Sequence, residues 1–192
     1  MQEKLFFPTF AIPNKREMYT IRKTTYDDIP CLMEMFREAR AFMAANGNPQ
    51  QWGDGYPDES IVRGDIKRGV SYVIEDRSTG TAASPSADGS HPVGTFALIP
   101  GKDPTYAVID DGAWQDDTLP YATIHRLASC TGSHGIADAC IAWSQQQSSN
   151  LRADTYRDNT VVQHILQKHG FRYCGIIYVR NHSPRLAYQW LR

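Results

Sequence analysis

The chain has 192 residues, enough for one domain with a substantial core, and its hydrophobic content of 41% is ordinary for a globular protein. The formal net charge is −1, so no strong positive field draws the protein to nucleic acid or to an anionic membrane. The chain contains no Gly-x-Ser-x-Gly elbow and no His-Glu-x-x-His zinc helix, which makes hydrolysis a poor functional prediction.

Residues 1–18 are partly apolar but are interrupted by prolines and lack a small-residue cleavage site. No apolar run is long enough to cross a membrane, so we expect an N-terminal arm over 1–18 and a single domain over 19–192. The four cysteines form no Cys-x-x-Cys pair and lie in apolar surroundings. This favours reduced core thiols in a cytoplasmic protein and predicts no metal site.

Alternating side chains predict a first strand over 19–23, and helical spacing predicts a helix that ends at Asn46-Gly47. A second helix is expected over 58–68. The polar loop between the helices carries Trp52 and Tyr56, which either line a pocket or fold back on the core.

Strands are predicted over 70–76 and 93–100. The stretch between them, 77–92, is rich in Ser, Thr, Ala and Gly and reads as a mobile hairpin loop. Residues 101–120 then carry four aspartates around Trp114: Asp110, Asp111, Asp116 and Asp117. Such a segment either attracts a cationic amine or forms a solvated turn.

The most informative stretch runs from Tyr121 to Trp143, because its apolar period changes from that of a strand to that of a helix. Strand alternation places His125 on one face with Thr123 and Leu127. The turn over 131–135 contains two glycines. Backbone N–H groups at the following helix N-terminus would form an anion site suited to a pyrophosphate.

Beyond this stretch we predict a strand over 151–156, a helix opened by Asp158-Asn159 and ended by His169-Gly170, and strands over 171–179 and 186–191. His164 and His169 are predicted to be surface residues. The order of elements implies an α/β (α+β) fold with a mixed sheet and helices on both faces.

The order of elements and several motifs resemble the GNAT family, the general-control-type N-acetyltransferases. The motifs are Ile124-His125-Arg126-Leu127-Ala128-Ser129, His134-Gly135-Ile136-Ala137, Asp154-Thr155-Tyr156-Arg157-Asp158-Asn159 and Lys168-His169-Gly170-Phe171. Gln51-Trp52 and Tyr173-Cys174-Gly175-Ile176-Ile177-Tyr178 are similar to an uncharacterised bacterial subgroup. The resemblance implies a GNAT-like, mostly antiparallel central sheet.

The resemblance also implies acetyl-CoA as co-substrate and a primary amine of a small molecule or peptide as acceptor. Residues expected to bind the cofactor are Leu127, Ala128, Ser129, Gly132, Ser133, His134, Gly135, Ile136, Ala137 and Asn159, with a backbone N–H near Leu127 or Ala128 facing the oxyanion. Asn159 either caps its helix or binds cofactor. The late strands of this fold often pair between subunits, which leaves a homodimer open.

Two positions depart from the family pattern. Gly132 stands where the pyrophosphate loop usually carries Gln or Arg, and Leu166 stands where many members carry a Tyr that protonates the leaving thiolate. The proton must then come from water or another group, and Tyr156, Tyr178 and Cys174 are candidates that are each also explained by structural roles.

The amine must lose a proton before it attacks a thioester, and an imidazole titrates near neutral pH. His125 is therefore the leading candidate base, with a core hydrogen-bonding role as the alternative. Trp52, Tyr56, Asp110 and Asp111 are predicted to form a cation-attracting acceptor pocket. The competing hypothesis is a GNAT-like module that binds acyl-CoA without turnover.

Overall fold

The computed structural model describes residues 19–53, 55–76, 91–179 and 182–192. The predicted N-terminal arm over 1–18 and most of the predicted hairpin loop over 77–92 lie outside these ranges. None of the helices formed by the described residues is long and apolar enough to cross a membrane.

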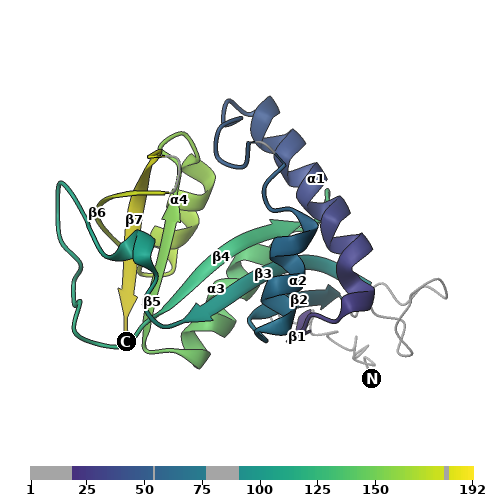
Figure 1. The fold of residues 1–192 in the computed structure, drawn as a ribbon, viewed down its shortest axis with the longest axis horizontal. Helices are drawn as coiled ribbons and strands as arrows, with labels where there is room; N and C mark the ends of the chain where they lie inside the picture. Colours follow the sequence, from purple (N-terminus) through teal and green to yellow (C-terminus); the bar gives the residue numbers. More distant parts are fainter. Residues whose placement is uncertain (1–18, 54, 77–90, 180–181) are drawn as a thin grey trace, which may run out of the picture.

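A seven-stranded sheet in the order β1-β2-β3-β4-β5-β7-β6 organises the described residues (Figure 1). Neighbouring strands pair antiparallel except β4 and β5, which are parallel. This confirms the predicted mixed, mostly antiparallel sheet. The strands are β1 (Tyr19–Lys23), β2 (Ser71–Asp76), β3 (His91–Pro100), β4 (Ala122–Ser129), β5 (Asn150–Thr155), β6 (Arg172–Tyr178) and β7 (Pro184–Leu191).

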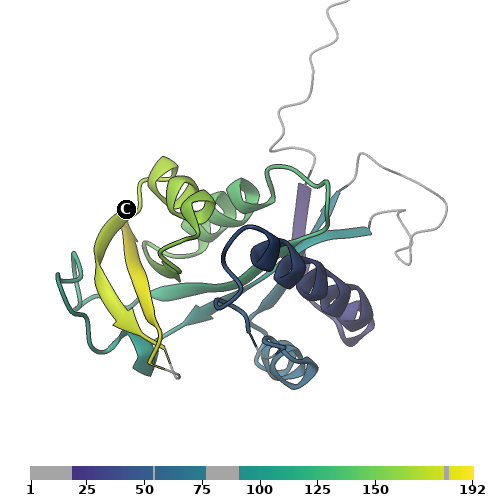
Figure 2. The same cartoon turned by 90° about the horizontal axis from the view of Figure 1, so that it is seen from above.

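Helices cover both faces of the sheet, as predicted (Figure 2). One face carries α1 (Ile29–Ala45) and α2 (Glu59–Lys67), and the other carries α3 (Ile136–Gln147) and α4 (Thr160–Lys168). Their ends follow local signals. The Asp58 carboxylate accepts a hydrogen bond from the Ile61 N–H at the start of α2, and the Asn159 side chain accepts one from the Val162 N–H at the start of α4.

The buried side chains of the described residues form three clusters. The largest lies between the sheet and α3 and α4, and includes Ile124, Ile136 and Leu151. A second lies under α1 and α2 and includes Leu32 and Ala128. The third packs beneath the segment between β3 and β4: Tyr106, Trp114, Tyr121, Cys174, Ile177 and Ala187.

A bulge in β4 changes which side chains share a face. Thr95 pairs with Ala128 and Ala97 pairs with His125, so β4 uses one residue more than β3 between these pairs. Arg126 lies within this interval and has a φ of 54°. Leu127 therefore packs with the α3 cluster, whereas Ala128 packs with the α1 cluster. The predicted placement of His125 and Leu127 on one face is wrong, because simple alternation ignores the inserted residue.

The parallel strands β4 and β5 pair at only two positions, Ala122 with Leu151 and Thr123 with Arg152. Beyond Thr123 the two strands separate, and the sheet divides into a half with β1 to β4 and a half with β5 to β7 (Figure 1). The opening between β4 and β5 begins immediately before His125, so the bulge and this opening place that histidine at the junction of the two halves.

Candidate active site

His125 lies between two carboxylates that come from different parts of the chain. Its Nε2 is 3.3 Å from Oδ2 of Asp103, and its Nδ1 is 4.0 Å from Oδ1 of Asp154. The imidazole also meets the ring of Tyr106 edge-on, with 5.9 Å between the ring centres. Its side chain is 20% exposed, so it remains accessible while its orientation is restricted.

Asp103 is positioned by the first turn of a short 3-10 helix over Pro104–Tyr106. Its carboxylate accepts a hydrogen bond from the Thr105 N–H at 2.8 Å, and its own N–H donates to the Tyr121 hydroxyl at 2.9 Å. The hydrogen bond to His125, together with the bonds from Thr105 and against the opposing effect of burial, lowers the pKa of Asp103 to about 2. Asp103 is therefore an ionised partner of the imidazole at neutral pH.

Asp154 lies on β5, across the opening from His125. The Tyr106 hydroxyl donates to its Oδ1 at 2.5 Å, and Nε of Arg185 lies 3.8 Å from its Oδ2. Complete burial, with the negative charge of Asp154 second, raises the pKa of Tyr106 well above its usual value. Tyr106 is thus a protonated hydrogen-bond donor that orients the Asp154 carboxylate.

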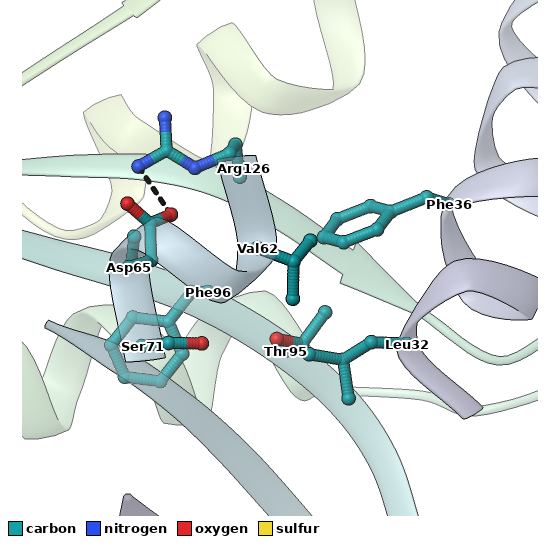
Figure 3. A pocket seen from close by; sticks show the side chains of 9 residues that line it. Leu32, Phe36, Val62, Asp65, Ser71, Thr95, Phe96 and Arg126 are labelled. Carbon is teal, nitrogen blue, oxygen red and sulfur yellow. Dashed lines mark ion pairs between the residues drawn. The ribbon is translucent and has the colours of Figure 1, made fainter. Parts of the chain in front are cut away.

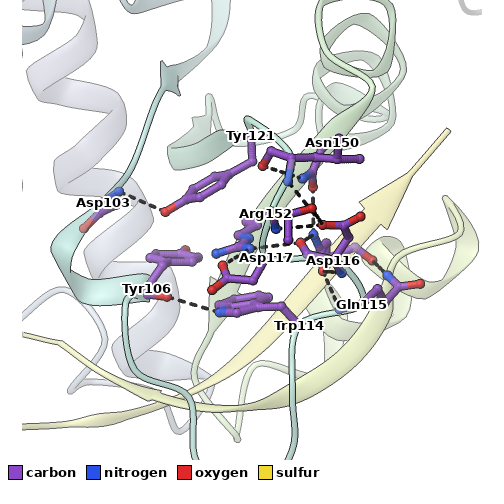
Figure 4. Close-up of polar contacts among 12 residues, drawn as sticks. Asp103, Tyr106, Trp114, Gln115, Asp116, Asp117, Tyr121, Asn150 and Arg152 are labelled. Atoms are coloured by element: carbon purple, nitrogen blue, oxygen red, sulfur yellow. Dashed lines mark hydrogen bonds and ion pairs between the residues drawn. The ribbon is translucent and has the colours of Figure 1, made fainter.

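Arg152 anchors the segment that carries Asp103 and Tyr106 (Figure 4). Its guanidinium lies 3.9 Å from the ring centres of both Trp114 and Tyr121, and its side chain is 1% exposed. It also forms an ion pair with Asp117 at 2.7 Å. These contacts link β5 to the segment between β3 and β4 from within the core.

The turn between β4 and α3 has the geometry expected of an anion site. Gly132 and Gly135 have φ values of 85° and 79°, which favour glycine, and a Cβ at either position would meet nothing within 4 Å. The left-handed conformation at Gly132 disfavours the Gln or Arg side chain that the resemblance leads one to expect. The first N–H groups of α3 have no intrahelical acceptors and point out of its N-terminus.

Other contacts bound this turn. Glu38 of α1 accepts hydrogen bonds from the Thr131 N–H at 3.0 Å and from the Thr131 hydroxyl at 2.8 Å. The carbonyl of His134 accepts a hydrogen bond from the Tyr19 hydroxyl at 2.7 Å. Thus α1 and β1 both fix the turn at its edges.

Arg126 connects the β4 bulge to the helices on its side of the sheet (Figure 3). Its Nη2 lies 2.7 Å from Oδ2 of Asp65 on α2, and its Nη1 donates to the Tyr56 hydroxyl at 3.0 Å. Tyr56 meets Trp52 edge-on at 6.4 Å, and Trp52 meets Phe36 at 5.7 Å. Trp52 and Tyr56 therefore pack together over α1, and Tyr56 contacts the residue after His125.

The loop between α1 and α2 also reaches the half of the sheet that contains β5 to β7. The carbonyl of Gln51 accepts a hydrogen bond from Nη2 of Arg185 at 3.3 Å, and its side-chain oxygen accepts one from Nδ2 of Asn159 at 3.1 Å. Asn159 caps α4 with its oxygen at the same time. The capping role predicted for Asn159 is therefore present, and its amide nitrogen faces Gln51.

The remaining predicted residues are dispersed. The ring of Tyr156 lies 4.9 Å below the Arg185 guanidinium, Tyr178 is exposed, and Cys174 is buried in the third cluster, where burial raises its pKa. Asp110 pairs through its backbone with Ile176 of β6. None of the contacts among the described residues joins Asp110 or Asp111 to Trp52 or Tyr56.

His169 differs from its prediction as a surface residue. Its side chain is only 10% exposed, and its Nε2 lies 2.7 Å from Oδ1 of Asp138 on α3. Lys168 contacts the same oxygen at 2.7 Å. Helical spacing alone did not reveal that α3 packs beside this end of α4.

Sequence reasoning missed Asp103, Tyr106 and Arg185 as site residues. Asp154 belonged to a recognised motif, but no role was assigned to it. In the structure Thr123 pairs with Arg152, and two residues further along each parallel strand are His125 and Asp154; this register cannot be read from the sequence. Nothing local predicted the return of Asp103 to His125, since 22 residues separate them in the chain.

No family model and no curated protein sequence matches the chain. Among solved structures, a GNAT-family acetyltransferase from Streptococcus agalactiae is 30% identical, with 91% of this chain and 95% of that chain covered and a TM-score of 0.78. A GNAT-family acetyltransferase from Listeria monocytogenes is 15% identical, with the same coverages and a TM-score of 0.61.

A more distant neighbour is a NatC complex bound to Gag peptide and CoA, which is 14% identical, covers 91% of this chain and 98% of that chain, and has a TM-score of 0.51. This similarity concerns the fold alone. The match to the streptococcal protein extends over nearly the whole of both chains at 30% identity. The chain therefore belongs to the GNAT family of acetyltransferases.

Proposed function

We propose that the protein transfers an acetyl group from acetyl-CoA to a primary amine of a small molecule or peptide, in the cytoplasm, through a single domain over 19–192. The observation that carries this proposal is the position of His125. It lies between Asp103 and Asp154 where β4 and β5 separate, on the strand that leads into the turn before α3.

The residues present fit a bound CoA. Gly132 and Gly135 add no side chain at their two positions in the turn, and the N–H groups at the start of α3 favour an anion such as a pyrophosphate. The opening between β4 and β5 exposes strand backbone to a chain-like ligand such as pantetheine, whose amides can pair as a peptide would. We propose that the cofactor is bound by Leu127, Ala128 and Ser129 on β4, by residues 132–137 in the turn and the start of α3, and by Asn159. When bound, acetyl-CoA supplies an acyl group activated as a thioester.

His125 is proposed as the general base that takes a proton from the acceptor ammonium or amine. Asp103 and Asp154 place negative charge beside the imidazole, which favours an approaching cation and the imidazolium that forms. The net proton then passes to solvent, since the His125 side chain is partly exposed. A backbone N–H of Leu127 or Ala128 is proposed to stabilise the oxyanion.

The candidate proton donors to the leaving thiolate are Tyr156, Tyr178, Cys174 and water. Cys174 is buried away from solvent and its thiol has a raised pKa, which disfavours rapid proton exchange. Tyr156 lies on the segment between β5 and α4, next to Arg185, and is the better placed of the two tyrosines. We propose Tyr156 or water for this step, with Tyr178 the weaker alternative because it is exposed on β6, the outer strand of the sheet.

We propose Trp52 and Tyr56 as acceptor-binding residues because Tyr56 contacts Arg126, the neighbour of His125. Asp110 and Asp111 remain candidates for acceptor binding only if a substrate extends along the segment between β3 and β4. A homodimer formed by the late strands would have to accommodate Asp110, which already pairs with part of β6.

The test is a thiol-release assay with purified protein, acetyl-CoA and a panel of primary amines, with mass spectrometry of the amine product. The proposal expects free CoA and acetylated amine in equal amounts. Binding of CoA by calorimetry without turnover of any amine would instead support the binding-module hypothesis. Absence of CoA binding at millimolar concentration would contradict both.

A further inference from the structure

The contacts around His125 distinguish its two ring nitrogens. Oδ2 of Asp103 lies 3.3 Å from Nε2, whereas the nearest acidic oxygen to Nδ1, on Asp154, is 4.0 Å away and beyond hydrogen-bonding distance. The Asp154 oxygen in question already accepts a hydrogen bond from Tyr106. The imidazole therefore has one direct carboxylate partner.

The charge of that partner decides the tautomer. A carboxylate that is ionised at neutral pH can only accept hydrogen bonds, so the nitrogen that contacts Asp103 must carry the hydrogen. The lowered pKa of Asp103, about 2, is consistent with this ionised state. Neutral His125 then carries its hydrogen on Nε2 and its lone pair on Nδ1.

Asp103 is itself tightly oriented. Its carboxylate accepts from the Thr105 N–H, its N–H donates to the Tyr121 hydroxyl, and the Tyr121 ring contacts the Arg152 guanidinium. The buried Arg152 thus fixes the Tyr121 ring, and Tyr121 in turn fixes the backbone of Asp103. Two hydrogen bonds therefore restrict where Asp103 can lie, and the Arg152 contact restricts the Tyr121 ring that forms one of them.

We propose that Asp103 is a positioning residue that holds His125 in the Nε2–H tautomer and makes Nδ1 the nitrogen that accepts the proton of the acceptor amine. In this step an N–H bond of the acceptor ammonium breaks and its electron pair stays on the nitrogen, which becomes the neutral amine. The proton forms a bond to Nδ1, and the positive charge passes to the imidazolium. Asp103 stabilises that cation through Nε2–H. The role of Nδ1 as proton acceptor rests on the proposed acetyl transfer. The Nε2–H tautomer does not depend on that proposal.

Several charged or titratable side chains of the described residues surround the imidazole. Asp103 faces it from the segment after β3 and Asp154 from β5; Tyr106 packs on its ring, and Arg185 of β7 offsets the charge of Asp154. In the Asp103→Asn variant only the negative charge of Asp103 is removed, and the other groups are unchanged. The imidazolium loses its closest negative partner, while Asn can still accept the Thr105 hydrogen bond.

The first experiment needs no substrate. Long-range ¹H–¹⁵N correlation spectra of the purified protein identify the tautomer of each histidine, with His125 assigned by comparison with His125→Gln. We expect an Nε2–H tautomer in the wild-type protein and a mixture in Asp103→Asn. An Nδ1–H tautomer in the wild type, or the same tautomer in both proteins, would overturn the proposal.

The second experiment measures kcat/KM against pH with acetyl-CoA and the most rapidly acetylated amine of the panel. Asp103→Asn is expected to lower the plateau about tenfold and to move the acid limb to lower pH, because the imidazolium loses its closest negative partner. Asp103→Glu should restore the limb toward its wild-type position because it restores the charge. Unchanged plateau and limb in Asp103→Asn would refute the proposed role.

Asp116→Asn is the matched control, because the Asp116 carboxylate also accepts backbone hydrogen bonds within the same segment but contacts no group near His125. It should retain the wild-type tautomer and pH profile. CoA affinity and melting temperature, measured for every variant, identify loss of fold. If the wild type acetylates no amine, the proposed function fails while the tautomer result stands. If the wild type is active and Asp103→Asn has the wild-type tautomer and pH profile, only the role inferred for Asp103 is refuted.

Discussion

The guanidinium of Arg152 lies 3.9 Å from the centre of the Trp114 ring, and this contact fastens the segment between β3 and β4 to the core. Arg152 is almost completely buried although its ion-pair partner, Asp117, is 65% exposed. The charge of Arg152 is therefore stabilised mainly by aromatic faces and by the Asp116 carbonyl.

Arg152→Met should lower the free energy of unfolding by about 1–3 kcal/mol, because the Asp116 carbonyl loses its donor and the Trp114 and Tyr121 rings lose the cation between them. Asp117→Asn, the control, should cost less than ~1 kcal/mol, since its side chain is exposed. Urea unfolding of both variants tests the difference. Equal effects would show that the ion pair, rather than the aromatic stacking, anchors this segment.

Gly135→Glu should abolish CoA binding. The φ of 79° disfavours any side chain, and the added carboxylate would repel a pyrophosphate at the α3 N-terminus. Gly69→Glu is a matched control because Gly69 also has a positive φ, 67°, and open space at its Cβ, but follows α2. Both variants should lose about 1–2 kcal/mol of stability through backbone strain. Calorimetry should show normal CoA affinity only for Gly69→Glu; wild-type affinity in Gly135→Glu would remove the turn from the proposed cofactor site.

His125→Ala should lower kcat/KM by about 10²-fold or more, the usual effect of losing a general base, and should remove the acid limb of the pH profile. CoA affinity should be retained, since no cofactor contact is assigned to this side chain. Steady-state kinetics and melting are measured on the same preparation. A stable variant with wild-type rates would leave water as the base and end the role proposed for His125.

Trp52→Ala should raise KM for the amine and leave CoA affinity unchanged if Trp52 lines the acceptor site. Because Trp52 also packs against Phe36 and Tyr56, we expect an additional loss of roughly 2 kcal/mol of stability. Trp52→Phe keeps an aromatic ring and separates the two effects. Parallel weakening of amine and CoA binding by Trp52→Ala would indicate a folding role alone.

Asp103 also makes the free energy of unfolding depend on pH in the acidic range. Its pKa in the folded protein, about 2, lies below its ordinary value of 3.8, chiefly because of the hydrogen bond with His125. A lowered carboxylate pKa stabilises the folded state above pH ~4, and this contribution is lost as the pH falls from ~4 to ~2. The stability difference between wild type and Asp103→Asn, measured by urea unfolding, should shrink over that interval; a constant difference would contradict the assigned cause.

The order of the elements, most helix ends and the strand–turn–helix over 121–143 could be predicted from the sequence, because each depends on signals within a few residues. Asp58 and Asn159 cap their helices through hydrogen bonds to residues three positions later, which do not depend on how the helices pack. Glycines mark turns that need positive φ. These same local signals carried the resemblance to the family, and hence the expected cofactor and reaction.

The environment of His125 was decided only by the tertiary structure. Its two carboxylates arrive from a loop and from a neighbouring strand, and no local periodicity reports contacts at such separations. The β4 bulge depends on pairing with β3, so alternation misplaced Leu127. The partners of a side chain across a sheet are determined by register and loop closure, which depend on the packing of the whole core rather than on neighbouring residues.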